Sequence, residues 1–270
     1  MEFCKELGLS DFYRGKNEAA SVLVEDVVDA SPFALDSGTT AAPASFDQQD
    51  DTLDMARQSA TLYQPVVALT PTSPLTPAQK PAALDAIRAD LGDCTRCPLC
   101  ETRNKIVYGD GDANASLMFV GEGPGADEDE QGLPFVGRGG QLLNNMINAM
   151  GLSREQVYIA NIVKCRPPQN RVPENMEANT CTPFLFRQID AIRPKLLVAL
   201  GATAATYLMA AKAPLNSLRG RIHDCRGAKL IVTYHPAYLL RDPRQKAEAW
   251  KDLQLAMQFL DLKAPAKTKE

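Results

Sequence analysis

One stretch of the chain decides the fold: the apolar run Leu117-Met118-Phe119-Val120, which leads directly into Gly121-Glu122-Gly123-Pro124-Gly125. The run has strand length and no polar alternation, which is typical of a strand covered on both faces. The glycines allow the backbone to approach a ligand closely, and successive N–H groups there can form an anion-binding nest. The stretch therefore predicts a buried strand with a ligand-binding loop at its carboxyl end.

Similar apolar runs occur further along the chain, at residues 157–160, 196–200 and 230–233. Helical patterns cover residues 82–91, 139–150, 174–191, 202–211 and about 245–260. Alternation of this kind predicts an α/β fold, a three-layer αβα sandwich around a central four-stranded, mainly parallel sheet. Ligands bind such sheets at the carboxyl ends of the strands, which points to the loops at residues 121–137 and 234–241.

Composition divides the 270-residue chain near residue 82. Residues 1–82 carry a net charge of −7, and residues 31–81 contain seven prolines, whereas the remainder carries +3. We interpret residues 1–82 as a largely disordered acidic, proline-rich extension, residues 83–262 as the folded domain and residues 263–270 as a basic tail. The net positive charge of residues 83–270 is compatible with a polyanionic partner.

Several classes of protein are excluded by the sequence. No apolar stretch reaches the roughly 18–20 residues that a membrane helix needs, and the first residues lack the pattern of a secretory signal. Seven cysteines without such a signal indicate a reducing compartment, so we expect a cytoplasmic protein. Residues 1–30 hold aromatic and apolar side chains, which predict either short, loosely packed helices or a docking segment for a protein partner.

The cysteines form a pattern that suggests metal binding. Cys94 and Cys97 make a C-x₂-C pair before the sheet, and Cys165 and Cys181 lie within it. A close pair chelates one metal well, and the wide second pair is common in iron–sulfur ligand sets, although zinc and ordinary buried thiols remain alternatives. Cys100 offers a second local C-x₂-C with Cys97, so spacing alone leaves the ligand set open.

Four side chains in the predicted loops could take part in chemistry or in ligand binding. Glu122 is a carboxylate held among glycines at a strand end, which helix capping explains poorly, unlike the acidic run that follows it. His235 precedes Pro236, which stiffens the turn and allows the ring to be aimed into the site. Phe135 fits either the core or a stacking platform. His223 lies in an apparent basic surface loop that could touch phosphate.

Three motifs, in the order in which they occur, resemble the family 4 uracil-DNA glycosylases. They are Gly121-Glu122-Gly123-Pro124-Gly125-Ala126-Asp127-Glu128-Asp129-Glu130-Gln131-Gly132-Leu133-Pro134-Phe135-Val136-Gly137, then Asn161-Ile162-Val163-Lys164-Cys165-Arg166-Pro167-Pro168, and His235-Pro236-Ala237-Tyr238-Leu239-Leu240-Arg241. The resemblance covers about residues 83–260. It implies an enzyme that flips uracil out of single- or double-stranded DNA, hydrolyses its N-glycosidic bond and leaves an abasic site.

The resemblance also implies roles for individual residues. The catalytic pair would be Glu122 and His235, and the uracil contacts would be Gly123, Glu128, Phe135 and Asn161. The DNA contacts would be Lys164, Arg166, Arg219, Arg221, Leu239, Leu240 and Arg241, with one of the two leucines as a wedge. The family's [4Fe–4S] cluster would be held by Cys94, Cys97, Cys165 and Cys181, with Cys100 a bystander and zinc the alternative cofactor.

Two other functions remain as alternatives. One is a non-catalytic, metal-braced nucleic-acid-binding module, which the placement of Glu122 and His235 at strand ends disfavours. The other is an enzyme acting on a free nucleotide, which would need no basic rim around the loops.

A related branch that crosslinks to DNA has glutamine in the glycine loop and an inserted histidine-bearing loop. Because this sequence has Gly123 and no such insertion, we expect turnover.

Overall fold

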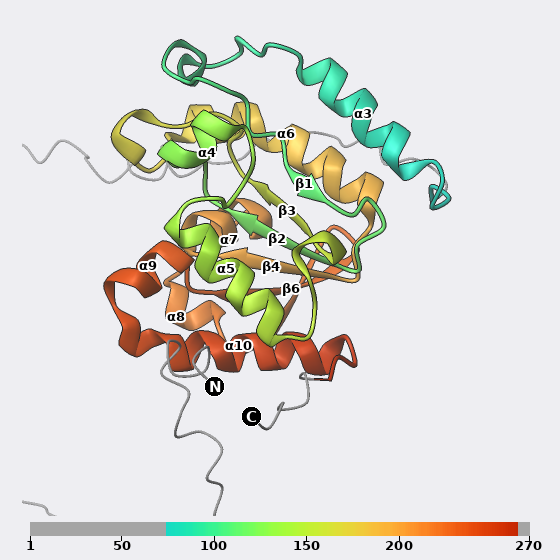
Figure 1. Ribbon diagram of the computed structural model, residues 1–270, viewed down its shortest axis with the longest axis vertical. Coiled ribbons are helices and arrows are strands. Elements are labelled where there is room, and N and C mark those ends of the chain that lie inside the picture. Colours follow the sequence, from blue (N-terminus) through green and yellow to red (C-terminus); the bar gives the residue numbers. More distant parts are fainter. Residues whose placement is uncertain (1–73, 264–270) are drawn as a thin grey trace, which may run out of the picture. The chain divides into compact units, whose positions relative to one another are not determined.

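The computed structural model describes residues 74–263, which form an α/β domain (Figure 1). The predictions for residues 1–73 and 264–270, including the docking segment, most of the linker and most of the tail, lie outside the described residues. The domain boundaries therefore stay predictions. The first described helix, α3 (Lys80–Leu91), begins close to the predicted position, with proline in its first turn.

Among residues 74–263, six strands form a single sheet in the order β1-β3-β2-β4-β6-β5. The four central strands are parallel and match the four apolar runs: β2 (Leu117–Gly121), β3 (Tyr158–Asn161), β4 (Leu196–Leu200) and β6 (Ala228–Thr233). Two short antiparallel strands, β1 (Asp110–Gly111) and β5 (Ile222–Cys225), extend the predicted sheet at its edges. His223 thus lies on an edge strand instead of a loop, with Nε2 2.8 Å from the carbonyl oxygen of Leu218.

Helices cover both faces of the sheet, which explains why its central strands lack polar alternation. Met118, Val120 and their neighbours pack with α6 (Asn175–Ile192), α7 (Ala202–Met209) and α3, which lies along α6 (Figure 1). Phe119 and the alternate residues pack with α5 (Arg138–Ala149) and α10 (Lys246–Phe259) on the other face. This is the predicted three-layer sandwich.

Short elements follow the strands where their carboxyl ends meet. They are α4 (Ala126–Gln131) after β2 and α9 (Pro236–Arg241) after β6, whereas the short helix α8 (Leu215–Leu218) follows α7. The remaining elements are the 3-10 turns η1 (Pro98–Glu101), η2 (Arg154–Gln156), η3 (Pro168–Asn170) and η4 (Pro243–Gln245). No helix within residues 74–263 has the length and apolar character needed to cross a membrane.

Candidate active site

A cavity of 1040 Å³ opens at the carboxyl ends of the parallel strands. Four strands contribute to its lining through the segments that follow them, and its walls include Glu122, Gly123, Phe135, Asn161, Thr203 and His235. The site therefore lies where ligands bind in open α/β sheets, and its size suits a small ring-shaped ligand with part of a polymer attached.

Gly121, the last residue of β2, allows the centre of the site to assemble. A Cβ atom at this position would lie 2.4 Å from Asn161 Oδ1 and 2.6 Å from Phe135 Cζ, well inside normal contact. The Phe135 ring centroid lies 5.6 Å from that of His235, with the rings inclined by 34°. Phe135, Asn161 and His235 thus meet around a residue that has no side chain.

The backbone of Phe135 is held in an uncommon conformation. Its φ angle is 52°, in the left-handed region that most side chains avoid. Arg154 donates from Nη1 to the Phe135 carbonyl at 3.0 Å and from Nη2 to the Pro134 carbonyl at 2.5 Å. A Cβ on Gly140 would lie 2.0 Å from the Phe135 carbonyl carbon, so this glycine admits the loop. These contacts fix the ring in the cavity.

The side chain of Asn161 has an unused acceptor. The residue is 1% exposed, and Oδ1 is a buried atom without a hydrogen-bond partner among the described residues. An unpaired buried acceptor costs about 1–3 kcal/mol, so in the folded protein this atom is satisfied by a water molecule or by a bound ligand. Since Asn161 lines the cavity, the geometry predicts a ligand that donates a hydrogen bond to Oδ1.

His235 is neutral at physiological pH. Burial and, secondarily, the positive charge of Arg241 lower its pKa to about 4, while Glu128 opposes them. The backbone N–H of Ala237 donates to Nδ1 at 3.2 Å, because His235 caps the start of α9. A neutral imidazole whose Nδ1 accepts must carry its proton on Nε2. His235 is therefore a neutral hydrogen-bond donor.

Glu122 is fixed from both sides of β2. Its carbonyl accepts from the backbone N–H of Val163 at 3.1 Å, which extends the pairing of β2 with β3. On the β4 side, Thr203 Oγ1 donates to Glu122 Oε2 at 2.5 Å. Sequence reasoning singled out Glu122 but missed Thr203, because nothing along the chain indicates that a threonine in α7 meets the glycine loop.

Glu128 braces the loop, whereas the sequence predicted a uracil contact. Its Oε2 accepts from the backbone N–H of Gly125 at 3.0 Å, and its Oε1 accepts from those of Val136 and Gly137 at 2.9 Å each. The carboxylate thus joins both ends of residues 125–137. The structure thus gives Glu128 a supporting role for the segment that carries Phe135, and because the residue also lines the cavity, its uracil contact stays a prediction.

Two of the predicted DNA contacts, Lys164 and Leu239, are wrong because their side chains are buried, and a third, Arg219, is partly buried and engaged within the protein. Lys164 is fully buried, and its Nζ donates to the Asn161 carbonyl at 3.0 Å and to Gln188 Oε1 at 2.7 Å. Leu239 is 1% exposed and packs in the core, so it is no wedge. Arg219 lies over the Tyr234 ring and donates to Asp252 Oδ2 at 2.7 Å, with its side chain 11% exposed.

The other predicted DNA contacts remain available to a nucleic acid. Arg241 is exposed and lines the cavity, and Leu240 beside it is partly buried. Arg221 is exposed next to β5, and Arg166 is partly buried with Nε donating to Asn170. Sequence reasoning missed Arg138, an exposed cavity residue at the start of α5. Exposed arginines beside the cavity favour a phosphate-bearing ligand.

The four predicted ligand cysteines come together beside α6. Burial, with smaller contributions from Cys97 and Cys94, raises the pKa of Cys181 to about 11, and burial likewise raises that of Cys165 to about 12. Cys181 and Cys97 contribute to the raised pKa of Cys165, so these thiols lie within electrostatic reach of one another. By contrast, Cys225 is buried elsewhere and its Sγ donates to the Leu208 carbonyl at 3.2 Å.

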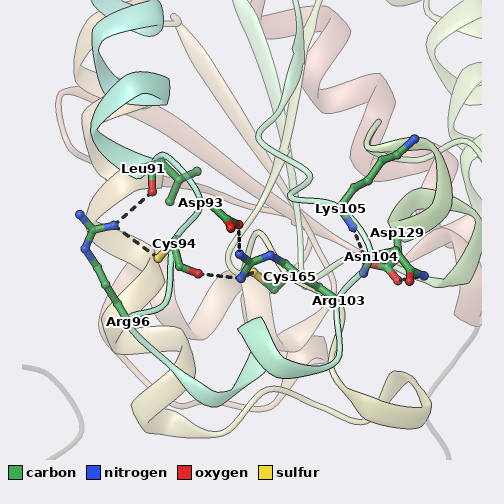
Figure 2. Close-up of polar contacts among 9 residues, drawn as sticks. All are labelled: Leu91, Asp93, Cys94, Arg96, Arg103, Asn104, Lys105, Asp129 and Cys165. Atoms are coloured by element: carbon green, nitrogen blue, oxygen red, sulfur yellow. Dashed lines mark hydrogen bonds and ion pairs between the residues drawn. The ribbon is translucent and has the colours of Figure 1, made fainter.

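Donors surround the sulfur atoms, as Figure 2 shows for two of them. Arg96 Nη1 lies 3.4 Å from Cys94 Sγ, and Arg103 Nη1 lies 3.5 Å from Cys165 Sγ and 2.7 Å from the Cys94 carbonyl. The backbone N–H of Lys164 donates to Cys181 Sγ at 3.2 Å. Donors and positive charges of this kind suit thiolates, so the donor set fits a bound iron–sulfur cluster.

Within residues 74–263, no group of three or more histidine, cysteine, aspartate or glutamate side chains is already arranged to hold one metal ion. Four cysteines are the ligand number of a [4Fe–4S] cluster and also of a structural zinc ion. The cysteine set therefore fits either group.

A buried carboxylate connects the cysteine region to the active-site loop. Asp129 of α4 is fully buried, and its Oδ1 accepts from the Asn104 backbone N–H at 2.9 Å. Its Oδ2 accepts from Asn104 Nδ2 at 2.8 Å (Figure 2). The acidic run at residues 127–130 thus contains one structural residue that the sequence did not distinguish from helix capping.

Comparison with known proteins places this geometry in a family. The model of the uracil DNA glycosylase superfamily matches residues 108–254. A type-4 uracil-DNA glycosylase from Thermotoga maritima is 43% identical over 181 residues, covering 66% of this chain and 94% of that protein. One from Archaeoglobus fulgidus is 38% identical over 191 residues, covering 68% and 96% respectively.

A second branch matches less well. A type-5 uracil-DNA glycosylase from Pyrobaculum aerophilum is 32% identical over 146 residues, covering 48% of this chain and 64% of that protein.

The chain belongs to the uracil DNA glycosylase superfamily and, within it, to the type-4 uracil-DNA glycosylases. The resemblance carried by the three motifs is thus confirmed, and the alternative of a non-catalytic binding module is not favoured.

Proposed function

We propose that this chain excises uracil from DNA with the cavity at the carboxyl ends of the strands, using Phe135, Asn161, His235 and Glu122. The observation that carries the proposal is the buried, unpartnered Oδ1 of Asn161 beside the Phe135 ring. A uracil ring stacked on Phe135 would donate from N3 to this atom and accept at O4 from the amide nitrogen. Cytosine would be rejected, because its N3 lacks a proton and its N4 is a donor.

The target base must first leave the helix stack. Flipping costs a few kcal/mol, and less in single strands or at a mismatch. Arg241 and Arg138, both exposed at the cavity, would meet the flanking phosphates. Their charges would hold the extruded nucleotide near the cavity without reading sequence.

His235 would stabilise the leaving group. When the C1′–N1 bond breaks, the bonding electrons pass to the base, and negative charge develops on uracil O2. The Nε2–H of a neutral imidazole can donate to this oxygen throughout the reaction, as an oxyanion-hole donor does. With a pKa of about 4, His235 keeps this form over the whole physiological range.

Glu122 would act on the sugar side. The departing base leaves positive charge on C1′ and the ring oxygen, in a transition state like that of glycoside hydrolysis. A carboxylate near this charge stabilises it and can accept a proton from the attacking water. Water then adds to C1′, which gives the abasic site and free uracil.

The four cysteines would hold an iron–sulfur cluster through Cys94, Cys97, Cys165 and Cys181. A bound [4Fe–4S] cluster supplies iron–thiolate bonds that tie the segment before the sheet to β3 and α6, and the excision needs no redox step from it. Cys181 connects to the site through Lys164, whose backbone contacts the sulfur and whose amine contacts Asn161. We place the enzyme in the cytoplasm, where such ligands stay reduced.

The direct test is incubation with an oligonucleotide that contains one uracil, followed by alkaline cleavage at abasic sites. Matched oligonucleotides with thymine or cytosine at that position serve as controls. Cleavage at uracil alone is expected, and Glu122→Ala and His235→Ala should each lower the rate by roughly 10²–10³ while binding changes much less. Full activity in both variants would contradict the proposed site.

A further inference from the structure

We propose that Thr203 is a positioning residue for Glu122, which fixes the carboxylate relative to the sugar without touching substrate. The proposal rests on the role given to Glu122 above. Its basis is the hydrogen bond of 2.5 Å from Thr203 Oγ1 to Glu122 Oε2, which connects α7 to the glycine loop. Both residues line the cavity and are partly buried.

The backbone that carries Thr203 is rigid. In the turn between β4 and α7, the N–H of Gly201 donates to the Thr233 carbonyl at 2.9 Å, and its carbonyl accepts from the Ala205 N–H at 3.2 Å. Ala204 and Ala205 are fully buried against the sheet, which fixes the helix axis. Threonine divides between two χ1 rotamers in a helix, and the hydrogen bond to Glu122 selects the one that aims the hydroxyl at the carboxylate.

The same turn also lies against the other catalytic side chain. Gly201 has a φ angle of 93°, and a Cβ there would lie 3.2 Å from His235 Cβ. One turn of backbone therefore lies close to His235 at Gly201, where a side chain would be crowded, and holds Glu122 through Thr203. Since the base and the sugar are joined by the bond that breaks, their two stabilising groups must keep a fixed separation, and this turn is placed to set it.

A side chain as flexible as glutamate needs such a contact in this loop. The Glu122 backbone is paired with β3, but its neighbours Gly121 and Gly123 have no side chains to restrain it. Without the hydroxyl, the carboxylate would rotate within the cavity. Misplacement of a reacting or charge-stabilising group by about 1 Å costs on the order of 10²-fold in rate.

Thr203→Val tests the proposal, because it removes the hydroxyl and keeps the shape. We expect kcat for uracil excision to fall roughly 10- to 100-fold, with KM changed by less than about threefold. Thr203→Ser, which keeps a hydroxyl, should restore most of the rate. Thr206→Val, the same change one turn further along α7, is the matched control and should leave kcat unchanged.

A double-mutant cycle separates positioning from a general structural effect. In the Glu122→Ala background, Thr203→Val should add less than about a twofold loss, because its partner is gone. An equal loss in both backgrounds, or full activity of Thr203→Val alone, would overturn the proposal. If Glu122→Ala itself keeps full activity, the proposed role of Glu122 fails and the proposal fails with it. If only Thr203→Val is silent, the role of Glu122 stands.

Discussion

Replacing Gly121 by alanine adds one methyl group at the centre of the site. Carbon atoms in contact normally lie about 3.5–4.0 Å apart. The new methyl would lie 2.6 Å from Phe135 Cζ and 2.4 Å from Asn161 Oδ1, so both side chains must move by about 1 Å. Because a 1 Å displacement costs on the order of 10²-fold, uracil excision should fall about 100-fold. Overpacking should also cost about 1–3 kcal/mol of stability.

Gly139→Ala is the matched control for this variant. It makes the same change in the same cavity, but its Cβ would lie no closer than 3.7 Å to any neighbour. In α5 it should be neutral or stabilise by up to about 1 kcal/mol. The assay is single-turnover release of uracil from a single-stranded oligonucleotide at a temperature where melting curves show both variants folded. A Gly121→Ala enzyme that works within about threefold of the parent would refute the proposed uracil slot.

Three further predictions concern pH, charge and the cluster. His235 has a pKa of about 4 in the folded protein against about 6.5 for an exposed imidazole, so the unfolded chain binds a proton first as pH falls. Stability present above pH 6.5 should therefore drop by up to about 3 kcal/mol towards pH 4, as urea unfolding would measure, and by less in His235→Gln. Lys164→Met should destabilise the protein by about 2–4 kcal/mol without changing the slope of log binding constant against log salt concentration. Arg241→Gln should reduce that slope by about one ion. A reduced slope in Lys164→Met would restore the phosphate contact predicted for Lys164. Cys181→Ser should abolish the broad absorption near about 400 nm and lower the melting temperature, whereas Cys225→Ser should change neither. Iron retained in the Cys181→Ser protein would exclude Cys181 as a ligand.

The centre of the fold could be predicted from sequence because its pattern is strong. The strand that contains Phe119, β2, is apolar throughout because helices cover both faces of the sheet. The edge strand β5 was missed because it is only four residues long, its apolar Ile222 is exposed and it contains charged Asp224. A short edge strand of this composition is indistinguishable from a surface loop until its partner, β6, is known.

The site could be predicted only where a residue's place on a strand determines its surroundings. Asn161 ends β3 and His235 lies two residues after β6, so both reach the cavity as expected. Lys164 also follows a strand, but three residues later the chain has turned and its amine points into the core towards Gln188. The contact between Thr203 and Glu122 joins residues far apart in sequence, and no spacing rule reveals it.

A crystal structure with free uracil would test the central claim most directly, because uracil is the proposed product. Uracil should lie against the Phe135 ring, with N3 within hydrogen-bonding distance of Asn161 Oδ1 and O2 facing His235 Nε2. Gly121→Ala crystals under the same conditions should show the slot closed. Uracil bound elsewhere, or bound with Asn161 Oδ1 still unpaired, would contradict the proposed site.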